Sequence, residues 1–183
     1  LTLEMANEEG LSIDAEGFTR LMKQQRERAK ADAKSKKSGH TDVTEYRKIA
    51  ESAGKLEFVG YESQESEAKI VGFLLDGAGV KSASAGDDVE IVLDRTPFYA
   101  EGGGQLADSG VITTSDGSVI EVEDVQAPIP GVFIHRGRVL SGQLKIGESV
   151  LAKIDSDRRK AISRAHTATH MVHKAFREIL GET

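Results

Sequence analysis

The sequence predicts an α+β protein in which helices precede a glycine-rich antiparallel β-barrel and a long helix follows it. The first observation behind this is a change of composition near residue 55, where a Pro-free helical pattern gives way to short apolar runs. Most of the 19 Gly residues and all three Pro residues lie between residues 55 and 154. The second observation is helical spacing, which returns after residue 154. These changes predict three regions, 1–54, 55–154 and 155–183.

The first region is predicted to be helical. Ser12 or Asp14 can cap the first helix, since both side chains accept hydrogen bonds from backbone N–H groups. The apolar stripe of this helix is narrow and consists of Phe18, Leu21 and Met22. Residues 23–37 are rich in Gln, Arg, Lys and Ala, so we expect this part to be solvated on most faces or to lie against a partner. A second, short helix is predicted at Thr44–Ala50, and Gly54 ends it.

The glycine-rich region is predicted to form a small barrel, because its apolar runs are short and are separated by turn residues, with no helical pattern between them. Asp116-Gly117, placed between two such runs, is a strong hairpin signal. The predicted strands are Leu56–Glu62, Ala68–Leu75, Asp88–Asp94, Gly110–Thr113, Val119–Val125, Phe133–Val139 and Ser149–Ile154.

The last region is predicted to be one long helix. It begins at Asp155 or Ser156 and runs to Leu180, and Gly181 is placed to cap its C-terminus. Apolar residues recur with helical spacing and are expected to form a buried stripe, which consists of Ile162, Ala165, Thr169, Val172, Phe176 and Ile179.

Composition excludes several classes of protein. The chain has 183 residues and no Cys, which rules out disulfides and thiolate metal ligands within it. No apolar run approaches the roughly 20 residues that a membrane span needs, and no signal-peptide pattern opens the sequence. A soluble, cytoplasmic protein is therefore expected. The net charge of −6 argues against non-specific binding to polyanions. The chain starts at Leu1, which suggests a piece cut from a longer protein.

Two histidines on the last helix form a candidate metal site. His166 and His170 are four residues apart, so both imidazoles lie on one helical face and can reach one ion. His173 lies one turn further on, as a doubtful third ligand. Thr167 stands where a zinc peptidase helix needs its Glu, so a peptidase is excluded. The alternative is two polar histidines on a helix flank without a metal.

The segment Arg95–Gly110 is the second candidate. Its three consecutive glycines let the backbone approach a ligand closely or adopt positive φ angles. Thr96, Glu101 and Gln105 add a hydroxyl, a carboxylate and an amide. The alternative is a bulge or barrel corner with no ligand, because the glycines match no phosphate-binding spacing.

The two candidates together point to one family. Thr96–Glu101 is followed by Gly103-Gly104-Gln105 and Asp108-Ser109-Gly110, and some sixty residues later by His166–His170. This order resembles the editing domain of alanyl-tRNA synthetases and the free-standing proteins that deacylate mischarged alanine tRNA. The resemblance covers essentially the whole chain, most firmly from Leu93 to Phe176, since residues 17–29 are also similar to the segment that precedes the editing domain in the synthetases.

The resemblance implies a glycine-rich barrel followed by an α/β editing subdomain, of which the last helix is the beginning. It implies that His166 and His170 bind zinc together with a later Cys and His, and that Thr96 and Gln105 line the editing pocket. We expect Thr96 and Gln105 to face the same cavity as His166 and His170, because chemistry at one ester requires the glycine-rich segment and the helix to converge. The implied substrates are Ser-tRNA(Ala) and Gly-tRNA(Ala), and the implied partners are tRNA(Ala) and the remaining domains of the synthetase. ATP would be used by a catalytic domain whose signatures are missing here. Because this chain has no Cys, we expect neither tight zinc binding nor activity from the 183 residues alone.

The chemistry explains why an editing site is needed. A pocket shaped for alanine rejects glycine poorly, because one methyl group is worth only about 1–3 kcal/mol of discrimination. Serine differs from alanine by a hydroxyl, which the Thr96 side chain could bind. Water would attack the ester between amino acid and ribose, with a metal either activating the water or positioning the aminoacyl end. The rival hypotheses are a non-catalytic RNA- or protein-binding module and a free-standing deacylase.

Overall fold

The computed structural model describes residues 14–35 and 43–181, and it divides the chain into two compact units, Leu1–His40 and Thr41–Thr183. In the first unit it describes one helix, α2 (Ala15–Ser35). Asp14 caps this helix, because its Oδ1 accepts a hydrogen bond of 2.7 Å from the Gly17 N–H. The other predicted cap, Ser12, lies outside the described residues.

The second helix, α3 (Val43–Ala53), belongs to the barrel unit and not to a separate helical segment. Its Tyr46 is buried, and the Tyr46 hydroxyl donates a hydrogen bond of 2.7 Å to Glu90 on the barrel. This tyrosine packs on the outer face of three strands, against Leu74, Val92, Val132 and Ile134. The compact units therefore do not divide at the predicted boundary after residue 54. The physical reason is that these strands are apolar on both faces, and the outer face needs a cover.

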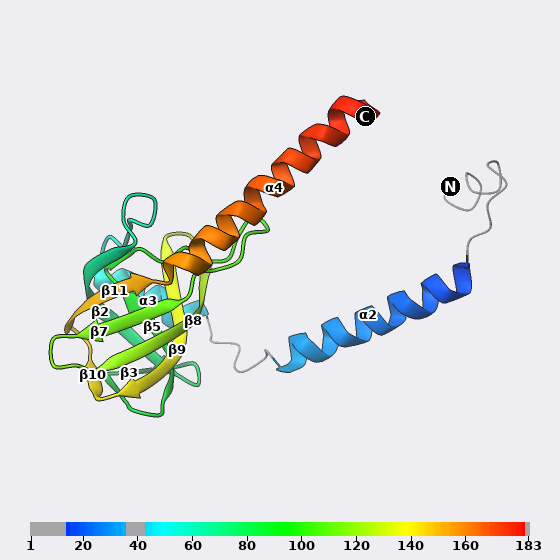
Figure 1. The fold of residues 1–183 in the computed structure, drawn as a ribbon. Helices are drawn as coiled ribbons and strands as arrows, with labels where there is room; N and C mark the ends of the chain where they lie inside the picture. The colour runs from blue at the N-terminus through cyan, green and yellow to red at the C-terminus, as the bar shows by residue number, and fades with distance from the viewer. Residues whose placement is uncertain (1–13, 36–42, 182–183) are drawn as a thin grey trace. The chain divides into compact units, whose positions relative to one another are not determined.

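Six strands form the barrel, and each pairs antiparallel with its neighbours. The predicted antiparallel barrel is thus confirmed, and no helix interrupts the described residues between Leu56 and Val125 (Figure 1). The order around the barrel is β2-β5-β9-β8-β7-β11, and β11 closes it by pairing with β2. The strands are β2 (Glu65–Leu75), β5 (Asp88–Leu93), β7 (Gly110–Thr114), β8 (Val119–Ile129), β9 (Val132–Ser141) and β11 (Ser149–Ile154).

Five shorter strands lie outside the six-stranded barrel ring. The predicted strand Leu56–Glu62 is wrong beyond its first residues, because the chain turns after Val59, whose carbonyl accepts from the Glu62 N–H at 2.9 Å. The others have three residues or fewer, which is too short for a periodic pattern to reveal. These strands are β1 (Glu57–Phe58), parallel to β6 (Arg95–Thr96), then β3 (Ala78–Val80), and finally β4 (Ser82–Ser84), paired with β10 (Gln143–Lys145).

One glycine in the barrel wall is required by close approach of two strands. Gly137 of β9 faces β8, and a Cβ atom at this position would lie 1.8 Å from the Glu121 carbonyl oxygen. Since that obstacle is backbone, it cannot rotate away. We expect Gly137→Ala to lower the free energy of unfolding by about 2 kcal/mol or more. Urea denaturation followed by circular dichroism would measure this. Gly79→Ala is the matched control, because its Cβ would meet nothing closer than 3.4 Å, and an equal loss there would contradict the explanation.

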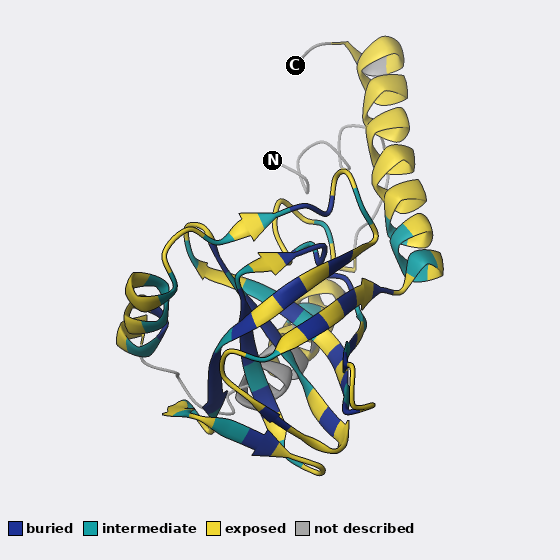
Figure 2. Cartoon of the chain, turned by 90° about the vertical axis from the view of Figure 1, so that its left-hand side faces the viewer, coloured by how far each residue is buried: buried dark blue, intermediate teal, exposed yellow. Residues whose placement is uncertain are grey.

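The last helix, α4 (Ser156–Leu180), is confirmed with both of its caps. The Asp155 carboxylate accepts from the N–H groups of Asp157 and Arg158, each at 3.0 Å, and Gly181 ends the helix with φ of 96°. The prediction that its apolar stripe is buried is wrong. Ile162 is half-buried, whereas Phe176 is 58% and Ile179 is 79% exposed. The helix extends past the barrel after its first turns, and no described residue covers the remainder (Figure 2).

Candidate functional site

The three glycines of the Arg95–Gly110 segment form a tight turn. The N–H of Gln105 donates to the Gly102 carbonyl at 3.0 Å, and the Gly102 N–H donates back at 3.2 Å. The two central residues, Gly103 and Gly104, have φ of 59° and 81°. Positive φ at both central positions is typical of a type I′ turn, which side chains other than Gly, Asn and Asp rarely allow. The glycines therefore fix the direction in which Gln105 leaves the turn.

Glu101, just before this turn, points to a neighbouring strand. Its Oε2 accepts a hydrogen bond of 2.9 Å from the side-chain amide of Gln126 on β8, and its N–H donates to the Val125 carbonyl. The carboxylate thus helps to attach the segment to the barrel. Of the three polar side chains that the sequence singled out here, Glu101 is the one that bonds to β8.

Gln105 and His166 line one pocket of about 420 Å³. The turn residues form one wall of this pocket, and the first four turns of α4 form the other. The predicted convergence of the glycine-rich segment and the histidine helix is therefore present for these two residues, whereas His170 is not among the residues that line the pocket. The lining consists of Gly104, Gln105, Leu106, Arg158, Ala161, Ile162, Ala165, His166 and Thr169.

The two histidines face each other on α4. The Nε2 atoms of His166 and His170 are 2.9 Å apart, and both side chains are exposed. Two nitrogens this close fit either a hydrogen bond between the rings or joint coordination of one cation. The described residues contain no group of three or more His, Asp or Glu side chains that could hold a metal. The pair alone falls short of the three or four protein ligands that a zinc site takes, so zinc binding by His166 and His170 stays a prediction.

We accordingly expect this 183-residue chain to retain no stoichiometric zinc. Affinity falls steeply when a zinc site lacks ligands, and His173 is on the same helix and cannot approach the ion from another side. Elemental analysis after dialysis against a zinc-containing buffer and then a zinc-free one measures this, with a His166→Ala variant as the control. One zinc per chain, lost in that variant, would contradict the expectation.

Thr96, unlike Gln105, lies inside the barrel and does not line this pocket. It is 1% exposed, and its Oγ1 is 2.7 Å from Nε2 of the fully buried His135. The other ring nitrogen, Nδ1, lies 3.0 Å from the Ile91 carbonyl oxygen, so Nδ1 donates and Nε2 accepts from the threonine hydroxyl. That hydroxyl also accepts from the Phe98 N–H at 3.1 Å. The expectation that Thr96 faces the same cavity as the histidine pair is therefore corrected, and its contact with a substrate stays a prediction.

His135 is a buried residue that the sequence did not single out. Burial lowers its pKa from 6.5 to about 4, an effect that the hydrogen bond to Ile91 opposes, so the ring is neutral. The signal for it was available, since His135 occupies an inward position of a predicted strand among apolar neighbours. A polar residue at such a position needs a partner, and Thr96 supplies one of the two.

A buried ion pair joins the two walls of the pocket. Asp108, three residues after Gln105, is 1% exposed, and Arg159 of α4 donates to both of its carboxylate oxygens, with Nε at 2.8 Å from Oδ1. The rest of the guanidinium donates to the carbonyl oxygens of Gly60 at 2.9 Å and Pro97 at 3.1 Å. The sequence placed Asp108 in a motif without giving its partner, because the two residues are 51 positions apart.

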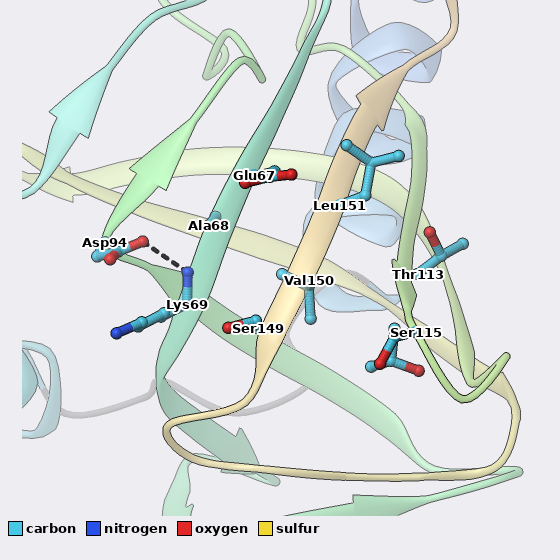
Figure 3. Close-up of a pocket in the computed structure, with 10 residues that line it drawn as sticks. Glu67, Ala68, Lys69, Asp94, Thr113, Ser115, Ser149, Val150 and Leu151 are labelled. Atoms are coloured by element: carbon cyan, nitrogen blue, oxygen red, sulfur yellow. Dashed lines mark hydrogen bonds between the residues drawn. The ribbon is translucent and has the colours of Figure 1, made fainter.

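A second pocket lies elsewhere, along the outside of β2, β11 and β7 (Figure 3). Its volume is about 580 Å³, and Lys69, Asp94 and Leu151 are among the residues that line it. The Lys69 N–H donates to the Asp94 carboxylate at 2.7 Å, so this carboxylate has a backbone partner. No histidine and none of the predicted site residues lies here, and the pocket beside Gln105 therefore remains the candidate site.

The helices of the described ranges include none with the length and apolarity that crossing a bilayer requires.

A family model described as tRNA synthetases class II (A) matches residues 1–158, so the chain belongs to that family. Over its whole length the chain is similar to alanine–tRNA ligases, which confirms the predicted resemblance. It is 58% identical over 183 residues to that of Streptomyces avermitilis and 59% identical over 184 residues to that of Acidothermus cellulolyticus. Each match covers 100% of this chain and 21% of the relative, so the chain spans about a fifth of their length.

Proposed function

We propose that the pocket between the glycine turn and α4 belongs to an editing site that hydrolyses Ser-tRNA(Ala) and Gly-tRNA(Ala). The observation that supports this best is that Gln105 and His166, from two segments about sixty residues apart, line the same pocket. The protein that contains this segment would attach alanine to tRNA(Ala), because its relatives are named alanine–tRNA ligases. We further propose that ATP drives this ligation. The hydrolytic site would then remove the wrong amino acids that the synthetic site accepts.

The side chains of the pocket are suited to holding an aminoacyl ester. The Gln105 amide has two donors and one acceptor group, which can bind the ester carbonyl or the amino group of the substrate. The apolar side chains of Leu106, which is 57% exposed, and of the half-buried Ile162 add apolar surface to the same lining. His166 offers a ring nitrogen on the opposite wall, where it can hold a proton or a metal. When zinc is bound by a completed ligand set, it supplies a Lewis acid or a positioning charge.

The test is deacylation of Ser-tRNA(Ala) by a full-length enzyme that carries this segment in place of the matching segment of the Streptomyces avermitilis ligase. We expect hydrolysis of Ser-tRNA(Ala) and Gly-tRNA(Ala) at rates well above the spontaneous rate, and little hydrolysis of Ala-tRNA(Ala). Tight binding of tRNA without hydrolysis would instead favour a non-catalytic RNA-binding module. Deacylation by the 183-residue chain alone would favour a free-standing deacylase.

A further inference from the structure

We propose that Asp108 and Arg159 are the positioning pair of this pocket, because their buried ion pair sets the place of His166 relative to Gln105. The effect of this pair on hydrolysis rests on the proposed function. Its effect on the distance between the two walls of the pocket does not, because both walls belong to this chain. Neither residue lines the pocket, so neither is expected to touch the substrate.

The position of each residue along the chain carries the first step. Arg159 precedes His166 by seven residues, which is about two helical turns, so both side chains leave α4 on nearly the same face. Asp108 follows Gln105 by three residues, at the end of the segment that contains the glycine turn. The ion pair therefore joins the two walls of the pocket at its base.

The second step is the number of elements that the pair ties together. Asp108 Oδ2 also accepts from the Tyr99 N–H at 2.8 Å, and the Asp108 N–H donates to the Tyr99 carbonyl at 3.1 Å. The Arg159 guanidinium reaches Gly60 and Pro97 in addition to the carboxylate. One charged pair thus holds the start and the end of the glycine-rich segment against the first turn of α4.

The third step is that few other contacts can hold the first turn of α4 against the glycine-rich segment. Beyond its first turns α4 is exposed, so its direction is set by contacts near its beginning (Figure 2). These include Arg158, which donates to the Ala107 carbonyl at 3.2 Å, and Ser156, whose hydroxyl donates to the Gln64 side chain at 2.6 Å. Arg158 reaches one carbonyl oxygen, to which its Nε also donates at 3.3 Å, and Ser156 makes one bond. Arg158 and Ser156 are both partly exposed, whereas the Arg159 side chain is 16% and that of Asp108 is 2% exposed. Breaking a buried ion pair leaves one charge uncompensated and displaces its surroundings.

The geometry can be measured directly because the chain has no native Cys. Leu106→Cys and Ala165→Cys place one thiol on each wall of the pocket, and both positions are exposed to reagent. We expect a short bismaleimide to cross-link them in the parent chain. Asp108→Asn should lower the initial rate of cross-linking by about fivefold or more. A loss of about 1 kcal/mol or more lowers by that factor the ratio of chains with the two walls in place to chains with the walls displaced. Arg159→Lys should do the same, because an ammonium cannot reproduce the multiple contacts of the guanidinium fork.

The matched controls are Asp88→Asn and Arg138→Lys, which make the same changes in an exposed pair 3.6 Å apart on the barrel. They should leave cross-linking unchanged. In the full-length enzyme, Asp108→Asn and Arg159→Lys should lower kcat for Ser-tRNA(Ala) hydrolysis about tenfold with little change in KM, as expected for misplaced reacting groups.

The outcomes separate the two proposals. Unchanged cross-linking in folded Asp108→Asn and Arg159→Lys chains would overturn the positioning role, even if the parent enzyme hydrolyses Ser-tRNA(Ala). Loss of the barrel's circular dichroism signal in both variants would also overturn it, because the pair would then be needed for folding. A parent enzyme that does not hydrolyse Ser-tRNA(Ala), together with slower cross-linking in the variants, would overturn the proposed function and support the positioning.

Discussion

Replacing Gln105 with Ala in the full-length enzyme is expected to lower kcat/KM for Ser-tRNA(Ala) hydrolysis about 100-fold and to leave alanine charging within about twofold. The reason is that Gln105 leaves the glycine turn toward the pocket that His166 lines. Removing one positioned hydrogen-bonding side chain from a hydrolytic site typically costs a factor of about 10² or more. Deacylation of preformed Ser-tRNA(Ala) and charging with alanine, measured side by side, test this.

Gln126→Ala is the matched control for Gln105. It removes the same side chain at a position bonded to Glu101 and outside the pocket, so hydrolysis should change little. Gln105→Glu adds a second comparison, because a carboxylate accepts hydrogen bonds but cannot donate them when ionised. Equal losses in Gln105→Ala and Gln126→Ala would show that the segment as a whole, and not the Gln105 amide, supports hydrolysis.

The second large effect concerns His135 and pH. Its pKa in the folded chain is about 4, against an ordinary value of 6.5, because the buried ring loses its hydration when charged. A depressed pKa means that the unfolded chain binds the proton more readily than the folded chain. The contribution of the neutral His135 ring to the free energy of unfolding is therefore fully present above about pH 6.5, and it is lost as the pH is lowered toward 4. The difference between the two values corresponds to a loss of about 3 kcal/mol at the acid end of this window.

The contribution of His135 can be isolated by comparison with His135→Gln. This variant keeps a polar side chain that can meet Thr96 but does not titrate, whereas the carboxylates of the chain are the same in both proteins. The free energy of unfolding in urea, followed by the circular dichroism of the sheet, should fall more steeply in the parent between pH 6.5 and 4. We also expect the variant to be less stable at pH 7 by about 1–3 kcal/mol, because it cannot fully replace both hydrogen bonds of the ring. Parallel pH profiles for the two proteins would contradict the assignment of this proton to His135.

Sequence reasoning succeeded where the signal is local. Short apolar or alternating runs predicted all six barrel strands, since such runs between turn residues are typical of strands with one or both faces buried. Capping residues predicted the beginning of α2 and both ends of α4, with side-chain caps at the two beginnings and Gly181 at the end of α4. The turn at Asp116-Gly117 is also confirmed, with a Gly117 φ of 89°. In each of these cases the residues that decide the structure are neighbours along the chain.

Sequence reasoning failed where the residues that pack around a side chain belong to distant segments of the chain. The helical spacing of Phe176 and Ile179 predicts an apolar face but not what covers it, and here that face is exposed. Tyr46 lies within a helical pattern, yet it packs on barrel strands, the first of which begins at Glu65, nearly twenty residues later. Thr96 was assigned to the pocket from its motif, whereas its hydroxyl is bonded to His135, which is 39 residues away.

By itself the sequence determined the order of the helices and of the six barrel strands, the closed apolar core and the two segments that resemble a known editing site. Only the tertiary structure decided which side chains of those segments meet. It brought Gln105 to His166, removed Thr96 from their pocket and gave Asp108 its partner Arg159. The physical reason is that periodicity and capping depend on energies between neighbouring residues, whereas these pairs form only after the closing barrel brings distant segments together.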